Sequence, residues 1–413
     1  MLDLAKIRRD FPVLERQVKG HQLVYLDSAN TSQKPTAVIQ AMSEFFLTHN
    51  ANVARAMHTL GTEASEAYES ARAKVASFIG AQSSQIIFTK NASEALNLAA
   101  YTLSSRLGPG DEVVISVAEH HSNIVPWQMA CERTGATLRW FDVDDDGFLD
   151  VEKARAQSLI NESTKVVSLT AMSNVTGVRF PIAEISAWAH VVGAVMVVDG
   201  SQLVPHESVD VAALGADLMA FTGHKMCGPT GIGILWGRYE LLESLPPFLS
   251  GGEMIEKVTM ARTTYAQPPY RFEAGTPPIG EAVGLAAAVD YLTEVGIEEI
   301  AAHTTSMTAY ALDVLAAIPE VRVLGPSSGD RVAAVSFELA DVHPHDVMQV
   351  LDARGVAVRG GHHCARPLHE RLGVQSSVRM SSYLYTTPED IDALGNALED
   401  TLVFFSVARG SRG

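Results

Sequence analysis

A lysine and a carboxylate stand at the ends of two apolar runs in the middle of the chain. Lys225 lies just beyond the run 217–222, and Asp199 ends the run 194–199. A lysine amine at the carboxyl end of a parallel strand can form a Schiff base. A buried carboxylate needs a cationic partner, such as a protonated pyridine nitrogen. Taken alone, Lys225 fits a solvated loop better than a catalytic role. The pair with Asp199, however, is typical of a site for pyridoxal phosphate, and Thr222 and His224 could hold the phosphate.

The sequence has three cysteines, and one of them lies in a basic setting. Cys364 follows His362 and His363 and is two residues before Arg366, which favours the thiolate form. Cys131 sits at an apolar helix position and reads as a packing residue. Cys227 is two residues beyond Lys225, and packing is the preferred interpretation there too.

The elements that must position these residues alternate in kind. Between residues 23 and 258, short apolar runs of strand length alternate with amphipathic stretches of helical length, such as 63–79. Most of the runs are apolar on both faces, which predicts buried strands of a mostly parallel α/β sheet with helices on both sides. The predicted strands are 85–89, 112–116, 137–141, 165–170, 194–199, 217–222 and 232–236.

The pattern changes after a segment rich in proline and glycine, 268–280. A long helix over 281–295 follows, and then a smaller α+β domain with strands over 321–324, 333–338 and 356–359. Helices are predicted over 297–317 and 344–354 and from Pro388. The run Gly228 to Gly233 leads into a strand, so it reads as a turn that lets backbone approach something, and not as a dinucleotide motif.

Composition excludes several classes of protein. The 413 residues carry 31 Lys+Arg against 48 Asp+Glu, a net charge of −17, which disfavours nucleic-acid and membrane-surface partners. Apolar runs are far shorter than the about 20 residues that a membrane span requires. Scattered cysteines and the absence of an apolar leader predict a reducing cytoplasm. No metal site is expected, because a calcium-like run at 142–147 has Lys153 where the bidentate glutamate belongs.

Nine stretches and Arg379, spread over nearly the whole chain, carry a resemblance to a known family. The sequence resembles a class V aminotransferase-fold enzyme, specifically a class II cysteine desulfurase of the Suf type. The matching stretches are 25–29, 52–58, 88–94, 119–127, 173–175, 199–202, 222–225, 271–277 and 359–365. The resemblance implies the type I fold of pyridoxal phosphate enzymes, with a mostly parallel seven-stranded sheet. It divides the chain into an N-terminal segment 1–22 packing with the small domain, a cofactor-binding domain 23–280 and a small domain 281–413.

The resemblance assigns the cofactor-binding residues. It makes Lys225 the lysine that binds the aldehyde and later moves the substrate α-proton. Asp199 would pair with the ring nitrogen, Gln202 with the ring hydroxyl, and His120 would stack on the ring, a core histidine being the alternative. The phosphate would be held by Ala92, Ser93, Thr222, His224 and, from the other subunit of a homodimer, Thr276.

The resemblance also implies the substrate and the reaction. Arg379, expected beyond the strands of the small domain, would clamp the substrate carboxylate together with Asn174. Arg359, His58 and Arg55 would be further substrate-binding residues. Cys364 would take the sulfur of L-cysteine as a persulfide, release L-alanine and pass the sulfur to an acceptor for iron-sulfur clusters or other sulfur-containing products. A selenocysteine lyase or another carbon–sulfur lyase is the alternative enzyme, and a non-catalytic scaffold the alternative from another class.

The sequence departs from the family pattern at a few positions. Asn30 stands where a small residue is expected after Ser28 and Ala29, and Gly360 stands where threonine is usual. Both departures fall near the predicted substrate mouth or the Cys364 loop, so they bear on substrate and acceptor preference.

Overall fold

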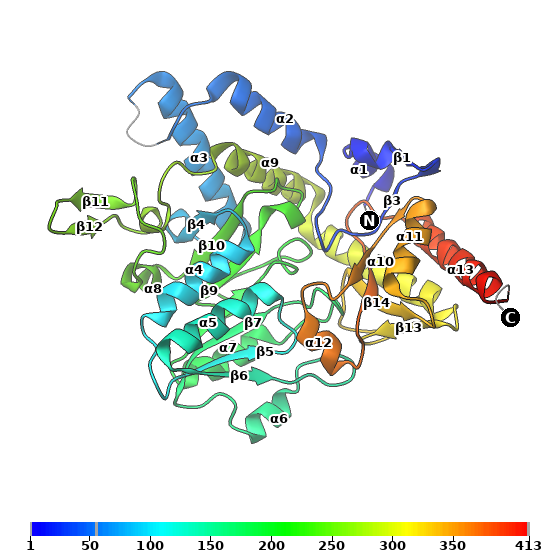
Figure 1. Cartoon of the computed structure of the whole chain (residues 1–413). Helices are drawn as coiled ribbons and strands as arrows, with labels where there is room; N and C mark the ends of the chain where they lie inside the picture. Colours follow the sequence, from blue (N-terminus) through cyan, green and yellow to red (C-terminus); the bar gives the residue numbers. More distant parts are fainter. Residues whose placement is uncertain (1, 54–56, 411–413) are drawn as a thin grey trace.

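A central sheet of seven strands forms the larger part of the molecule (Figure 1). The computed structural model describes residues 2–53 and 57–410, with only the backbone for 407–410. The strands lie in the order β4 (Ile86–Thr89), β10 (Gly233–Gly237), β9 (Leu218–Thr222), β8 (Val195–Asp199), β7 (Thr164–Thr170), β5 (Glu112–Ser116) and β6 (Thr137–Phe141). All neighbours are parallel except β10, which is antiparallel to both of its neighbours. The predicted α/β fold is confirmed, and each strand predicted between residues 85 and 236 is found.

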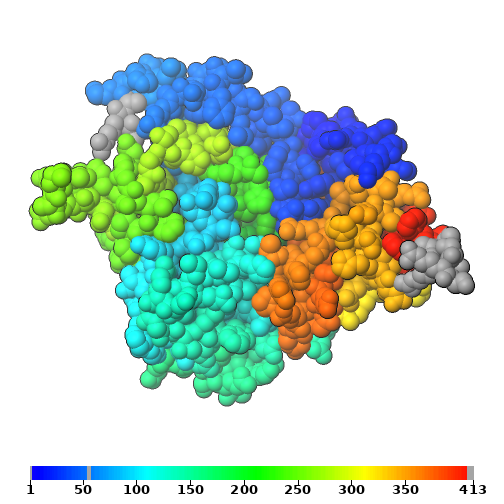
Figure 2. Space-filling model, viewed as in Figure 1, coloured from blue at the N-terminus to red at the C-terminus, as the bar shows by residue number. Residues whose placement is uncertain are grey.

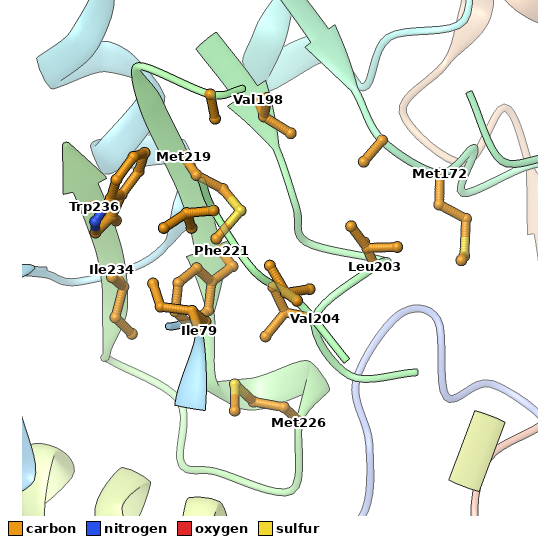
Figure 3. Packing of buried hydrophobic residues seen from close by; sticks show 14 of the residues in the cluster. Ile79, Met172, Val198, Leu203, Val204, Met219, Phe221, Met226, Ile234 and Trp236 are labelled. Carbon is orange, nitrogen blue, oxygen red and sulfur yellow. The ribbon is translucent and has the colours of Figure 1, made fainter. Parts of the chain in front are cut away.

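Side chains of alternate strand residues fill two hydrophobic clusters, one on each face of the sheet. Met219 and Phe221 of β9 pack with Ile79 and Ile234 on one face, as Figure 3 shows. Leu218 and Ala220 lie in the other cluster. This alternation follows from the two-residue period of a strand, and both faces are covered because the strands are apolar throughout.

Helices from distant parts of the chain supply the covering layers. The first face is covered by α3 (Thr59–Phe78), α7 (Ile182–Val191) and α9 (Ile279–Val295). The second is covered by α4 (Ala92–Ser104), α5 (Val125–Thr134) and the short α8 (Tyr239–Ser244). These layers fix where each strand ends, and hence where the side chains beyond the strands lie.

A smaller antiparallel sheet carries the C-terminal third of the chain. Its strand order is β13 (Val321–Leu324), β14 (Ala334–Leu339), β17 (Ser377–Ser381) and β16 (Arg359–Gly361). A third hydrophobic cluster lies against α10 (Ile297–Ala316), α11 (Pro344–Ala353) and α13 (Pro388–Gly410). Figure 1 shows this part beside the large sheet, with α12 (Arg366–Arg371) between the two.

Two sequence-based predictions for this part are wrong. The strand predicted over 356–359 is two strands: β15 (Val356–Ala357) pairs with β3 (Val24–Tyr25), whereas β16 pairs with β17. Arg379 was expected beyond the strands, but it lies in β17, whose five residues are all buried. Two serines and an arginine hide that strand from an apolar-run search, although their side chains are buried and make hydrogen bonds inside the fold.

The remaining elements lie around these two sheets. The N-terminal segment holds α1 (Leu4–Arg9), β1 (Gln17–Val18) and β2 (His21–Gln22), and Arg8 reaches Asp390 at 2.7 Å. A hairpin of β11 (Ile255–Val258) and β12 (Thr263–Tyr265) projects from the body (Figures 1 and 2). The other short helices are α2 (Thr36–Glu44) and α6 (Val151–Ala156). Among the described residues, no helix has the length and apolar character to cross a membrane.

One buried ion pair joins α3 to the segment that precedes α9. The Arg72 guanidinium binds both oxygens of Glu273, at 2.7 and 2.9 Å, and the side chains are 1% and 7% exposed. Tyr68 and the backbone amide of Phe88 donate to the same carboxylate. Every hydrogen bond of the Glu273 carboxylate therefore joins elements that are far apart in the sequence.

We expect Glu273→Ala to lower the free energy of unfolding by about 3 kcal/mol or more, because it leaves the Arg72 charge buried without its buried partner. Glu69 is the matched control, since it binds the same guanidinium from a side chain that is 42% exposed. Glu69→Ala should cost less than about 1 kcal/mol. Denaturant titration measures both, and equal losses in the two variants would contradict this account.

Candidate active site

One cavity at the carboxyl edge of the large sheet brings together most of the predicted site residues. It encloses about 250 Å³ and lies between the large sheet and the loop that carries Cys364. Twelve predicted residues line it: Ala92, Ser93, His120, Asn174, Asp199, Gln202, Thr222, His224, Lys225, Arg359, Cys364 and Arg379. These residues come from both sheets, so the cavity exists only where the two parts of the fold meet.

Asp199 and Lys225 reach this cavity from neighbouring strands. Asp199 ends β8 and is 4% exposed, and its Oδ1 accepts a hydrogen bond from the Ser201 amide at 2.9 Å. Lys225 ends the short 3₁₀ turn Gly223–Lys225 that follows β9. Burial lowers the pKa of Lys225 to about 8, while the nearby Asp199 carboxylate opposes the shift. A lysine with this pKa has an appreciable neutral fraction near pH 7, as an amine nucleophile or base requires.

The turn that carries Lys225 is held by the segment just before α2. The His224 carbonyl accepts hydrogen bonds from the Ser32 amide, the Thr31 hydroxyl and the Lys34 amine, at 3.0, 3.0 and 2.9 Å. The next residue, Met226, is buried in the cluster beneath the sheet, as seen in Figure 3. The lysine is thus anchored on both sides in the chain.

Glycines allow the backbone to close around one end of the cavity. A Cβ at Gly233 would lie 2.3 Å from the Asn91 carbonyl carbon, so only glycine lets β10 pass the start of α4. This close approach is what the predicted glycine-rich turn permits. The first amides of α4, at Ala92 and Ser93, face the cavity end, where an anion is favoured. Nearby, the buried Thr222 hydroxyl has no hydrogen-bond partner within the described part of the chain.

His120 lines the cavity as a neutral imidazole. Its Nδ1 accepts a hydrogen bond from the Ser122 amide at 3.1 Å, which places the ring proton on Nε2. Burial, with a smaller contribution from the Lys225 charge, lowers the pKa of His120 to about 3. A neutral ring suits stacking on an aromatic cofactor.

Arg379 is fully buried and is oriented by two fixed oxygens. Its Nη1 donates to the Asn174 carbonyl at 2.8 Å, and its Nη2 lies 3.4 Å from Asp27 Oδ1. Burial lowers the pKa of Arg379 to about 10, and Asp27 opposes that shift. A guanidinium held in this way is arranged to bind a carboxylate bidentately.

Cys364 sits on a strained loop between β16 and α12. Both His363 and Cys364 have positive φ, 51° and 58°. The large domain holds this backbone from two sides: the His121 amide donates to the Cys364 carbonyl at 2.7 Å, and Asn174 Nδ2 donates to the His363 carbonyl at 2.7 Å. The thiol is half-buried, with Arg359 Nη2 at 3.9 Å from Sγ. The strain is kept because contacts across the two domains determine it.

Three predicted residues do not line this cavity. Thr276 lines a separate cavity together with Lys90 and Glu94. His58 is exposed and caps α3 by accepting a hydrogen bond from the Gly61 amide. Arg55 lies outside the described residues.

Sequence reasoning missed a buried carboxyl group beneath the site. Glu119 accepts hydrogen bonds from Ser116, Asn123 and the Thr170 amide, at 2.5, 2.7 and 2.8 Å. Burial raises the pKa of Glu119 to about 8. The sequence offered one sign of this buried carboxyl group, since Glu119 comes directly after the apolar pair Val117 and Ala118.

The cavity residues fit pyridoxal phosphate. Asp199 and Lys225 lie at the ends of adjacent strands, and neutral His120 lines the same cavity. The α4 amides and the Thr222 hydroxyl, which has no partner among the described residues, suit the phosphate.

Comparisons with known proteins agree with this site. The family model for class V aminotransferases matches residues 24–394. A probable cysteine desulfurase from Streptomyces coelicolor is 55% identical, and a cysteine desulfurase from Haloferax volcanii is 46% identical, each match covering 98% of both chains.

Solved structures of related proteins match in the same way. The apo structure of a cysteine desulfurase from Thermococcus onnurineus is similar with a TM-score of 0.91 and 37% identity, covering 97% of this chain and 98% of that one. The Escherichia coli cysteine desulfurase CsdA has a TM-score of 0.90 at 37% identity, covering 98% of this chain and 99% of that one. The chain therefore belongs to the pyridoxal-phosphate-dependent class V aminotransferase family and groups there with the cysteine desulfurases.

Proposed function

We propose that this protein converts L-cysteine into L-alanine and takes up the sulfur as a persulfide on Cys364. The observation that carries the proposal is the placement of the Cys364 thiol, with Arg359 beside it, in the same cavity as Lys225, Asp199 and Arg379. A carbon–sulfur lyase that releases its sulfur directly has no need for a thiol there.

Bound pyridoxal phosphate supplies an electron sink that makes the substrate α-proton acidic and its Cβ–S bond labile. The residues proposed to hold it are Lys225 at the aldehyde, Asp199 at the ring nitrogen, Gln202 at the ring hydroxyl and His120 on the ring face. Gln202 is itself fixed, because its Nε2 donates to the Ala29 carbonyl at 2.9 Å, so that its amide oxygen is oriented by the protein. Ala92, Ser93, Thr222 and His224 complete the phosphate end.

The chain's own groups then orient the substrate and move protons. Arg379 binds the substrate carboxylate, and the Lys225 amine takes the α-proton. The Cys364 thiolate attacks the substrate sulfur, so that an S–S bond forms while the Cβ–S bond breaks. The electron pair of the broken bond stays with the three-carbon fragment, which takes up one proton at Cβ, regains the α-proton from Lys225 and leaves as alanine.

The persulfide must then pass its outer sulfur to an acceptor protein or thiol. We propose an acceptor in iron-sulfur cluster assembly or in the synthesis of another sulfur-containing molecule, and a class II, Suf-type enzyme, on the basis of the stretch 359–365. We also propose that the chain has three parts. Residues 23–280 form the domain that binds the cofactor, residues 281–413 form the small domain that carries the thiol, and the N-terminal segment 1–22 packs against the small domain. The ion pair between Arg8 and Asp390 supports the placement of that first segment.

A homodimer is part of the same proposal. Thr276 lies outside the cavity of its own chain, yet it belongs to a stretch that resembles the family pattern. It is therefore proposed to complete the phosphate site of a second subunit. His58 and Arg55 are proposed as substrate-binding residues.

The rate at which pyridoxal phosphate attaches covalently to the cofactor-free protein should follow the Lys225 titration. Only the neutral amine is a nucleophile, so the rate should rise with pH up to about 8, the lowered pKa of Lys225, and then level off. For an exposed lysine, the rate would continue to rise until the pH reached about 10.4, the pKa of a free lysine. Borohydride trapping with peptide mass spectrometry measures the rate and the position. A reduced adduct on any other lysine, or its persistence in Lys225→Ala, would refute the assignment.

Removing the Cys364 thiol should separate sulfur transfer from cofactor binding. Cys364→Ala should keep the visible absorbance of the cofactor and still respond spectrally to L-cysteine, because the groups proposed to bind the cofactor are elsewhere. Alanine formation should fall about a hundredfold or more, and trapped persulfide should disappear. Cys131→Ala is the matched control, since that cysteine packs in α5. Near-parental turnover by Cys364→Ala would favour the lyase alternative.

The dimer is tested through Thr276. We expect sedimentation of the holoenzyme to give twice the mass of the chain, and Thr276→Val to weaken cofactor retention about tenfold through loss of one hydrogen bond to the phosphate. Thr134→Val, on α5, should leave retention unchanged. An active, cofactor-saturated monomer at assay concentration is the outcome that contradicts shared sites.

A further inference from the structure

Arg359 extends from β16 into the cavity and has two partners there. Its Nη1 donates a short hydrogen bond to Asn30 Oδ1, and its Nη2 lies 3.9 Å from Cys364 Sγ. A contact to sulfur at this distance is weak by itself. Within the described residues, Asn30 therefore supplies the one strong hydrogen bond that fixes the Arg359 guanidinium.

Asn30 is itself held in one orientation. Its Nδ2 donates to Asp27 Oδ2 at 3.0 Å, and its backbone amide donates to the Asp27 carbonyl at 3.1 Å. Turning the amide over would place Oδ1 against the Asp27 carboxylate and NH₂ against a guanidinium, and both contacts would be repulsive. An asparagine is thus suited to bridge a carboxylate and a guanidinium, and neither alanine nor serine can reach both.

Asp27 also contacts Arg379, but Arg379 has a second partner that holds it. Asp27 Oδ1 is 3.4 Å from Arg379 Nη2, whereas Arg379 Nη1 is fixed to the Asn174 carbonyl at 2.8 Å. Loss of the Asn30 side chain would therefore release Arg359 and leave the orientation of Arg379 largely intact.

We propose that Asn30 is a positioning residue that holds the Arg359 guanidinium against Cys364 and so keeps the thiol reactive. A positive charge beside a cysteine favours the thiolate, provided that the charge is kept there. Arg359 is a long side chain with much conformational freedom to lose, and without a fixed partner it would spend less time at the thiol. The proposal deepens the proposed function, because it concerns the residue that would take up the sulfur.

Other charges face the same thiol, so the test must isolate the route through Arg359. The Lys225 and Arg379 charges act on Cys364 from the large sheet and from β17. His121 binds the Cys364 carbonyl, and Arg366 follows on α12. A double-mutant cycle between Asn30 and Arg359 leaves these groups in place and measures only the coupling of the pair.

The experiment measures the rate at which iodoacetamide alkylates Cys364 in the holoenzyme at fixed pH, followed by peptide mass spectrometry. Asn30→Ala should slow alkylation about five- to tenfold, and kcat for L-cysteine should fall by a similar factor with KM within about twofold. In the Arg359→Ala background, Asn30→Ala should have no further effect. Asn30→Ser should behave as Asn30→Ala does, because its hydroxyl is too short to make both contacts.

Asn161→Ala is the matched control. Asn161 also donates to a carboxylate that binds an arginine, Glu112 with Arg139, but at the opposite edge of the sheet. The Asn161→Ala variant should leave the alkylation rate and kcat unchanged. Cofactor absorbance confirms that each variant is folded, and a small residue at position 30 is the expected family pattern, so alanine should be tolerated.

An equal slowing by Asn30→Ala with and without Arg359 would overturn the proposal, as would a raised KM with unchanged kcat. These results differ from a failure of the proposed function. If Cys364→Ala were fully active, the sulfur route would be wrong, while the alkylation cycle would still report whether Asn30 acts on the thiol through Arg359.

Discussion

The arrangement of this molecule depends on burying opposite charges at the ends of adjacent parallel strands. Asp199 and Lys225 lie where β8 and the turn after β9 leave the sheet, and the pKa of Lys225 is lowered by burial and partly restored by the carboxylate. Two covered faces are needed to keep water away from this edge. The helices on both faces are therefore a condition of the chemistry as well as of stability.

The second requirement is that groups from two sheets meet. Arg379, Arg359 and Cys364 come from the small sheet and its loop, whereas the proposed cofactor residues come from the large one. Two backbone contacts, from the His121 amide and from Asn174, connect the thiol loop to the large sheet. These contacts place the thiol and hold its unfavourable backbone conformation.

Much of this could be predicted from the sequence, and the failures have physical causes. The strands of the large sheet are continuous apolar runs, so their ends, and with them Asp199 and Lys225, could be located by pattern. β17 escaped because burial of Arg379 and two serines depends on partners far away in the sequence. The same holds for Asn30 and Glu119, whose roles follow from contacts and leave only an unexpected residue type as a trace in the sequence.

The backbone at Gly233 and the loop at Cys364 differ in how much structural change they tolerate. Gly233 is locked by backbone against backbone, so the end of the cavity formed by α4 cannot change without moving β10. The Cys364 loop follows β16, the edge strand of the small sheet, and hydrogen bonds from the His121 amide and from Asn174 join it to the large domain. Substitutions in that loop can therefore alter the proposed transfer of sulfur while the cofactor end stays as it is. An enzyme built in this way can acquire new recipients for its sulfur without rebuilding its chemistry.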